Sequence, residues 1–201
     1  NCFDNEKPAH TQTVEPFVIG KYEVTQGQWQ AVMGTNPSRF AGCGAECPVE
    51  LVSWTDVQAF IEKLNARGEG SYRLPTEVEW EYACRSGGKP EKYCGGDEAG
   101  MVAWNEGNAG KTTHPVGGKA PNGLGIHDMS GNVFEWVCSD GGKYDDDGKN
   151  HTKCSIGGPA RMMRGGGWFS APAYARTTYR VSYDPGYQFG SIGFRLVRET
   201  P

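Results

Sequence analysis

The chain has 201 residues, a length that suits one large domain, and its 20 Lys and Arg against 24 Asp and Glu give a net charge of −4 without long blocks of either sign. Its 30 Gly and 12 Pro make 42 residues, about 21% of the chain against a usual share of about 12%, beside 6 Trp, 9 Tyr and 8 Phe. This composition favours a compact, loop-rich fold around packed rings over a disordered chain, a coiled coil or a solenoid, and the lack of a basic cluster argues against a nucleic-acid partner.

A strand and a short helix are expected at the start of the chain. Residues Phe17–Thr25 are typical of a strand. The pattern Thr25-x-x-Gln28 then has the form of a capping box, in which two side chains each bond the backbone N–H of the other residue. A helix should follow to about Met33, before Pro37 and a glycine-rich stretch end it.

Two more helices are predicted before residue 90. Thr55-x-x-Gln58 opens the first of them, and Thr76-x-x-Glu79 opens the second, which should run to about Arg85 before two glycines stop it. The first carries apolar residues at the helical spacing i, i+3, i+4 and i+7, namely Val57, Phe60, Ile61 and Leu64.

The remainder of the chain, after Gly87, has Gly or Pro at short intervals and only brief apolar runs, of which Phe134–Cys138 predicts a strand. We expect ordered loops held by buried rings, and, because no linker or repeat interrupts the chain, a single domain over residues 1–201. No stretch approaches the roughly 18 apolar residues that span a bilayer. The rings expected to hold the loops are Trp80, Trp104, Phe134, Trp136, Trp168, Phe169 and Phe194.

Seven cysteines are many for a chain of this length. Cys43 and Cys47 lie in a glycine-rich loop, and Cys138 and Cys154 flank an acidic run at residues 145–147. Neither arrangement is a C-x-x-C zinc or redox motif, so disulfides and a periplasmic or secreted location are predicted, with one cysteine left over. The acidic run is predicted to be a solvated loop, since Lys149 falls where an EF-hand places an oxygen ligand.

Four segments carry a signature that covers nearly the whole chain. They are Gly20-Lys-Tyr-Glu-Val-Thr25, Arg73-Leu-Pro-Thr-Glu-Val-Glu-Trp80, Gly131-Asn-Val-Phe-Glu-Trp136, and Arg164-Gly-Gly-Gly-Trp168 with Gly193-Phe-Arg195. In this order they resemble the sulfatase-modifying-factor family, whose founding member is the formylglycine-generating enzyme. The resemblance implies one α+β domain with the C-type-lectin-like fold of that enzyme, loop-rich, with short helices and twisted antiparallel strands. It also implies a strand before Asn1, and a partner for Cys2 in that region.

The enzymes of this family oxidise a cysteine of their sulfatase substrate with oxygen and a copper ion, which two cysteine thiolates hold. Counting back from Arg180 and Gly193 places the second thiolate position on Thr177 and the first on Pro172. Neither residue can bind copper, and no cysteine follows Cys154. The resemblance therefore implies a member without copper and without formylglycine-generating activity.

The same resemblance implies a structural calcium site within Asp128–Glu135. Its ligands would be the side chains of Asp128 and Glu135 and the backbone carbonyls of Gly131 and Val133. Calcium takes six to eight oxygen ligands, and carbonyls of a tight turn are among those it uses. The competing interpretation is a plain polar turn that leads into the strand at Phe134. A second calcium site of the family would lie near residues 104–114, where no ligands can be assigned.

Two functions remain open at this point. The first is a non-catalytic extracytoplasmic binding or regulatory protein. Cysteine-less relatives include the accessory protein that promotes kinase-driven activation of type VI secretion in the bacterial periplasm, and ligand-displaying proteins diversified by retroelements. A periplasmic sensor domain is then the expected kind of protein partner. The second is a periplasmic oxidoreductase of different chemistry, as in relatives that mature a siderophore chromophore.

Both functions would use the cleft that holds the copper site in the enzymes. The residues expected at the cleft are Phe134, Trp168, Tyr174, Arg176, Thr177 and Arg180, with Trp168 equally compatible with a place in the core. An enzyme would need a catalytic acid or base, and near the last of these residues the sequence offers only Tyr179, Tyr183 and Asp184.

Overall fold

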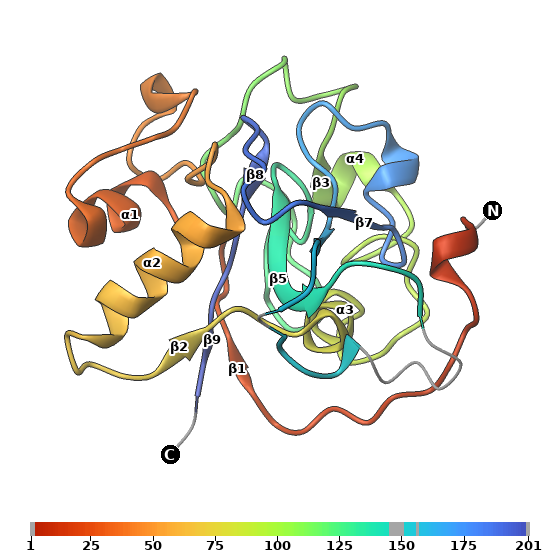
Figure 1. Ribbon diagram of the computed structural model, residues 1–201. Coiled ribbons are helices and arrows are strands. Elements are labelled where there is room, and N and C mark those ends of the chain that lie inside the picture. The colour runs from red at the N-terminus through yellow and green to blue at the C-terminus, as the bar shows by residue number, and fades with distance from the viewer. Residues whose placement is uncertain (1–2, 145–150, 156, 200–201) are drawn as a thin grey trace.

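The computed structural model describes residues 3–144, 151–155 and 157–199, so the predictions for Cys2 and for the acidic run at 145–147 lie outside the described residues. Regular elements are short and separated by long loops, a mixed helix and strand architecture (Figure 1). The described helices are α1 (Gln26–Met33), α2 (Trp54–Asn65), α3 (Glu77–Cys84) and α4 (Ala99–Val102), with 3-10 helices η1 (Asp4–Glu6), η2 (Ala41–Cys43) and η4 (Pro172–Tyr174). The described strands are β1 (Val18–Ile19), β2 (Tyr72–Arg73), β3 (Ala103–Trp104), β4 (Ser130–Gly131), β5 (Phe134–Asp140), β6 (Arg161–Arg164), β7 (Arg180–Tyr183), β8 (Ile192–Gly193) and β9 (Val197–Arg198).

Capping boxes open all three long helices. Thr25 caps α1 and Thr76 caps α3, each with the reciprocal bonds that the sequence predicts. The start predicted for α2 is two residues late, because Ser53 rather than Thr55 is the cap and Asp56 completes the box. The earlier start lets the indole N–H of Trp54 donate to the carbonyl of Val137 at 3.1 Å, which anchors the first turn of α2 to β5.

The strand predicted over Phe17–Thr25 forms a ladder only at β1. The segment stays beside the C-terminal strand further on, since the N–H of Gly20 donates to the carbonyl of Leu196, and the N–H of Val24 to that of Phe194. A bend at residues 21–22 interrupts the ladder, where the carbonyl of Lys21 instead accepts the N–H of His127. The predicted strand is therefore extended chain with a short ladder.

A four-stranded sheet in the order β7-β6-β5-β8 lies at the centre of the molecule (Figure 1). β6 pairs antiparallel with both β5 and β7, and β5 pairs parallel with β8. Successive side chains of a strand point to opposite faces of the sheet, so each strand contributes side chains to the packing on both faces. Phe134, Met163 and Ile192 belong to one hydrophobic cluster, whereas Val137 and Met162 belong to another that contains α3 residues.

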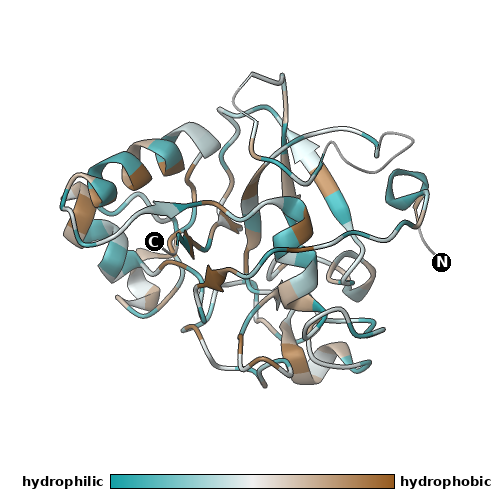
Figure 2. Ribbon diagram, turned by 90° about the horizontal axis from the view of Figure 1, so that it is seen from below, coloured by the Kyte–Doolittle hydropathy of each residue, from teal (hydrophilic) through white to brown (hydrophobic). Residues whose placement is uncertain are grey.

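The first cluster joins α1 and α2 to the C-terminal part of the chain. Trp29 of α1 stacks on Phe60 of α2 with ring centroids 5.1 Å apart, and Phe60 meets Phe194 edge to face. Figure 2 shows hydrophobic and hydrophilic segments alternating along these helices, as the apolar stripe of α2 predicts. Of the rings expected to be buried, Trp80, Trp136 and Phe194 are fully buried. Phe169 is 43% exposed, so the prediction that it is buried is wrong.

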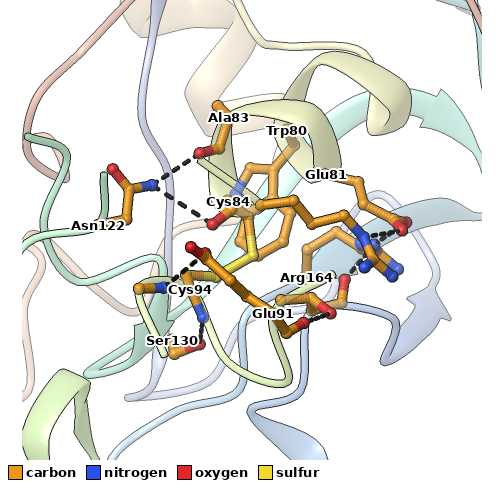
Figure 3. The surroundings of a disulfide bond; sticks show 12 residues. Trp80, Glu81, Ala83, Cys84, Glu91, Cys94, Asn122, Ser130 and Arg164 are labelled. Carbon is orange, nitrogen blue, oxygen red and sulfur yellow. Dashed lines mark hydrogen bonds and ion pairs between the residues drawn. A yellow bond between two sulfur atoms is a disulfide. The ribbon is translucent and has the colours of Figure 1, made fainter. Parts of the chain in front are cut away.

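Three disulfides confirm the prediction of oxidised cysteines, Cys43–Cys47, Cys84–Cys94 and Cys138–Cys154. They indicate an oxidising, extracytoplasmic compartment. Cys84–Cys94 ties the end of α3 to the following loop, and Figure 3 shows how neighbouring residues hold both ends. The side chain of Asn122 donates to the carbonyl of Ala83 at 2.7 Å, and the hydroxyl oxygen of Ser130 accepts the N–H of Cys94 at 3.0 Å. Along the described ranges of the chain, we find no helix with the length and apolar character needed to cross a membrane.

Candidate functional site

A pocket of about 460 Å³ opens on one face of the four-stranded sheet. Its floor contains Phe134 of β5, Met163 of β6, Val181 of β7 and Ile192 of β8, and its walls come from the segment around η4 and from the loop before β8. We call it the aromatic pocket because seven rings line it: Phe134, Phe169, Tyr174, Tyr179, Tyr183, Tyr187 and Phe189.

The rings at the rim of the aromatic pocket remain open to solvent. Tyr183 and Tyr187 stack with centroids 4.4 Å apart, and Phe169 meets Phe189 edge to face at 5.6 Å. Phe3 extends the surface, since its ring stacks on that of Tyr174. Among the eleven large hydrophobic residues exposed in the described part of the chain, six lie here, each 38–44% exposed: Phe3, Phe169, Tyr174, Tyr183, Tyr187 and Phe189. Contiguous exposed apolar patches are typical of interaction sites.

Polar groups are few in the aromatic pocket. In the part of the chain that the structure describes, Glu106 is the one charged residue that lines the pocket, and its backbone N–H donates to the carbonyl of Ser170. Burial raises the pKa of Tyr179, which keeps its hydroxyl protonated at neutral pH. The hydroxyl of Ser191, at the floor, is buried and has no hydrogen-bond partner within the described residues.

Of the six residues predicted at the cleft, Phe134 and Tyr174 line the aromatic pocket. Trp168 lies behind the wall and is partly buried, since its indole N–H donates to the carbonyl of Gly190 and its ring meets Phe40 edge to face. Trp168 therefore supports the loop before β8 from inside.

Arg176, Thr177 and Arg180 do not line the aromatic pocket. Arg176 pairs with the buried carboxylate of Glu6 at 2.6 Å and so holds η1, and with it Phe3, against the pocket wall. Arg180 neighbours Val181 in β7, and because Val181 faces the pocket, Arg180 points to the opposite face. The expectation that these three residues offer contacts in the cleft is corrected accordingly.

The opposite face of the sheet holds a buried charge network around Glu77 of α3. Arg180 donates to both carboxylate oxygens of Glu77, at 2.7 and 2.6 Å, and the Nδ1 of His151 lies 2.9 Å from the same carboxylate. Arg164 lies 3.4 Å from Glu77 and also pairs with Glu81. Burial alone would raise the pKa of Glu77, but the hydrogen bond with His151 and the two guanidinium charges outweigh it and lower the pKa to about 2.

The sequence did not predict this network, although Arg164 begins the signature segment Arg164–Trp168. Arg164 also donates to the carbonyls of Thr177, Thr178 and Tyr179. It therefore connects α3 to the strand edge that carries one wall of the aromatic pocket. The alternation of side chains along β6 and β7 could have indicated the network, since it places Arg164 and Arg180 on the same face of the sheet.

The expected calcium ligands lie beside a second buried charge group. Asp128 has one carboxylate oxygen bonded to the N–H of Gly117 at 2.6 Å, whereas its other oxygen is buried without a partner within the described residues. Glu135 accepts hydrogen bonds from the side chains of Arg195 and Trp80, all at 2.7–2.8 Å. Gly131 has a positive φ of 84°, and a Cβ there would lie 2.3 Å from the carbonyl oxygen of Trp104, so only glycine fits this turn.

Glu23 is a member of this group that the sequence did not single out. Its carboxylate accepts hydrogen bonds from the side chain of Asn132 at 2.7 Å and from the N–H of Val133 at 3.2 Å. Burial, and then the charges of Asp128 and Glu135, raise the pKa of Glu23 well above its usual value. Within the described ranges, no three His, Cys, Asp or Glu side chains are arranged to hold a metal ion, and the expected site has only two such side chains.

The comparisons with known proteins place the chain in a family. A domain described as "Sulfatase-modifying factor enzyme 1-like" matches residues 1–200. The chain belongs to this family. The domain is 35% identical over 92% of its length to the chaperone protein LppX of Paenibacillus barcinonensis, and covers 81% of that protein. It is 36% identical over 76% of its length to the formylglycine-generating enzyme of Streptomyces coelicolor, but spans only about half of that enzyme (52%).

Solved structures of similar proteins confirm the formylglycine-generating-enzyme-like fold of this sulfatase-modifying-factor domain. Treponema denticola variable protein 1 aligns with a TM-score of 0.80 and 30% identity, covering 90% of this chain and 84% of that one. PvdO from Pseudomonas aeruginosa aligns with a TM-score of 0.80 and 25% identity, covering 98% and 85%. The serine/threonine-protein kinase pkn1 of Chlamydia pneumoniae is 35% identical over 77% of the domain, which covers 24% of that kinase.

In this member of the family, the two positions expected to carry copper thiolates have structural roles. Pro172 is the first residue of η4, beside the aromatic pocket. Thr177 is buried, its hydroxyl donates to the carbonyl of Glu91 at 2.9 Å, and its N–H donates to the carbonyl of Lys92 at 3.0 Å. Thr177 therefore fastens the pocket wall to the loop that Cys94 closes.

Proposed function

We propose that this domain is a non-catalytic binding protein of the periplasm or the extracellular space, and that the aromatic pocket and its rim contact a protein partner. The observation that carries the proposal is the group of six exposed rings at one place on the surface. Tyrosine and other rings give large contact areas with few rotatable bonds, and they dominate the binding energy of protein interfaces.

The chemistry of the cleft also favours binding over catalysis. Pro172 and Thr177 supply no thiolate, and the one carboxylate that lines the pocket within the described ranges comes from Glu106. Tyr179 is a poor base because burial raises its pKa. Asp184, another acid or base that the sequence offered, is exposed and does not line the pocket.

For the partner we propose a periplasmic sensor domain, and for the pathway a role as an accessory activator of kinase signalling in type VI secretion. The likeness to part of the Chlamydia pneumoniae kinase supports this, since there a similar segment is part of a protein named as a kinase. The disulfides, which need an oxidising compartment, also agree with it.

Replacing two of the exposed aromatic residues at the rim of the pocket should strongly weaken binding of the protein partner. We expect the double variant Tyr187→Ser/Phe189→Ser to bind at least about 30-fold more weakly, because the loss of one hot-spot ring from an interface costs about 2 kcal/mol or more. The measurement is quantitative affinity capture from periplasmic extract with wild type and variant side by side. Tyr82→Ser is the matched control, since Tyr82 is 42% exposed and lies on α3 outside the pocket. Equal capture by wild type and double variant would refute the proposal.

A second candidate is a periplasmic oxidoreductase that uses the same pocket. The likeness to PvdO over 98% of the chain and the size of the aromatic pocket, within the usual range for ligand sites, favour it. A small molecule that copurifies with the chain and is chemically altered on incubation with oxygen would support this candidate. Recovery of an unaltered protein partner through the rim rings would support the first.

We propose in addition that calcium stabilises the turn at Asp128. Three buried carboxylates, those of Glu23, Asp128 and Glu135, face the single guanidinium of Arg195, and one oxygen of Asp128 has no partner within the described residues. A divalent cation would balance this excess of negative charge. Asp128 would hold it with the carbonyls of Gly131 and Val133, while Glu135, already bonded to Arg195, retains free lone pairs.

Calcium should therefore raise the melting temperature of the wild type relative to a chelator. At a calcium concentration 100 times the dissociation constant, binding adds about 2.7 kcal/mol to the free energy of unfolding. This corresponds to a rise in melting temperature of roughly 5–10 °C for a chain of this size. Asp128→Ala should abolish the rise, and the exposed Asp97→Ala should keep it. Identical melting in calcium and in chelator would favour the plain polar turn.

A further inference from the structure

The charges around the aromatic pocket are negative or balanced. Glu106 is its one charged lining residue, and Asp184 lies in the rim loop between Tyr183 and Tyr187. The nearby guanidinium of Arg176 is neutralised by Glu6. Among the described residues the lining includes no Lys, Arg or His, so an anionic ligand would find no counter-charge from them.

The rings themselves add to this preference. The face of an aromatic ring carries partial negative charge and attracts a cation, with an energy that grows when the cation is removed from water. Four of the seven rings that line the pocket are tyrosines, and Tyr183 and Tyr187 are both exposed beside Asp184. A carboxylate among rings is the combination that favours an organic cation.

The hydrogen-bonding groups of the pocket distinguish between kinds of cation. A primary ammonium has three N–H donors, each of which needs an acceptor once buried. The hydroxyl oxygen of Ser170 already accepts the N–H of Gly167, so the acceptors left to a ligand are the tyrosine hydroxyls, the unpartnered hydroxyl of Ser191 at the floor and the carboxylate of Glu106. A methylated ammonium needs few or no acceptors, and its methyl groups pack against rings, so it suits this lining better.

We propose that the aromatic pocket binds an organic cation that carries a methylated ammonium group, with Glu106 as its counter-charge. The inference rests on the proposed binding function and names the chemical group that enters the pocket. That group is carried either by a free small molecule or by a methylated lysine of the protein partner, and the experiment distinguishes these two sources.

The test compares choline with its neutral isostere 3,3-dimethylbutan-1-ol by calorimetric titration of the full chain. We expect choline to bind at least tenfold more tightly than the isostere. Glu106→Gln should weaken the binding of choline at least threefold and leave the binding of the isostere unchanged. Glu62→Gln, an exposed control on α2, should change neither affinity. A peptide with trimethyl-lysine, set against the same peptide with norleucine, forms the second arm. Tighter binding of the trimethyl-lysine peptide than of choline assigns the group to the partner, and the reverse assigns it to a free ligand.

Equal or tighter binding of the neutral isostere would overturn the inference, as would binding of choline that does not depend on Glu106. The proposed function is decided separately, by capture of a protein partner through Tyr187 and Phe189. If capture depends on these rings while choline and the trimethyl-lysine peptide fail to bind, the cation inference falls and the binding function stands. If choline binds while capture is independent of the rings, the protein-binding proposal falls.

Discussion

Replacing Glu77 by glutamine is expected to lower the free energy of unfolding by about 3–5 kcal/mol. Glutamine keeps the shape of the side chain but removes the charge, which leaves the buried guanidinium groups of Arg180 and Arg164 without their shared counter-charge. Urea denaturation at pH 7 measures the change. Glu62→Gln, on the exposed side of α2, is the matched control and should stay within about 0.5 kcal/mol of wild type.

The effect of Glu77→Gln should also depend on pH in a defined direction. The carboxyl of Glu77 has a pKa of about 2 in the folded chain against an ordinary value of 4.5, so the native state favours its charged form. Its contribution, about 3 kcal/mol from this difference, is complete above pH 4.5 and is lost as the pH falls toward 2. The gap between wild type and variant should therefore narrow between pH 5 and 2. A gap below 1 kcal/mol at pH 7, or one that is constant with pH, would show that the network does not act as described.

Removing the Cys84–Cys94 disulfide should cause the second large loss of folding stability. The bond closes a loop of ten residues in sequence, for which the chain-entropy argument gives about 3 kcal/mol, and both cysteines are buried. We expect Cys84→Ala/Cys94→Ala to lower the melting temperature by roughly 10 °C. Cys43→Ala/Cys47→Ala is the control, since that bond closes a shorter loop and should cost about 2 kcal/mol. A larger loss from the control pair would contradict the argument.

The same disulfide bears on the aromatic pocket. Cys94 donates its N–H to the hydroxyl oxygen of Ser130, and that hydroxyl donates to the carbonyl of Ala175 at 2.7 Å. Thr177 bonds to the backbone of the loop just before Cys94. A position where the family's enzymes are expected to carry a copper thiolate is thus used here to hold one wall of the pocket.

The sequence was most informative where a local rule decides the structure. Thr25 and Thr76 each have their capping partner three residues later, and both helices begin there. For α2 two capping patterns overlap by two residues, and the contact of Trp54 with β5, which no local pattern contains, selects the earlier one. The spacing of motifs was enough to infer the family.

The pocket was predicted only in part, because it depends on contacts between distant segments. The sequence placed Arg180 three residues after Thr177, but that spacing does not reveal that β7 turns Val181 toward the pocket and Arg180 toward Glu77. The rings of Tyr187 and Phe189 lie in a loop without periodicity, and only the fold brings them to Phe134. The pairing of Cys84 with Cys94 could not be predicted from the sequence either, since seven cysteines with one left over allow 105 different sets of three disulfides.

Photo-crosslinking from the rim of the aromatic pocket tests whether a protein partner binds through these rings. A benzophenone side chain would replace Tyr187 in one variant and Tyr82 in another, positions that are 38% and 42% exposed. We expect a specific covalent adduct with one periplasmic or extracellular protein from position 187 and none from position 82. Adducts of equal yield from both positions, or an adduct from position 82 alone, would contradict it.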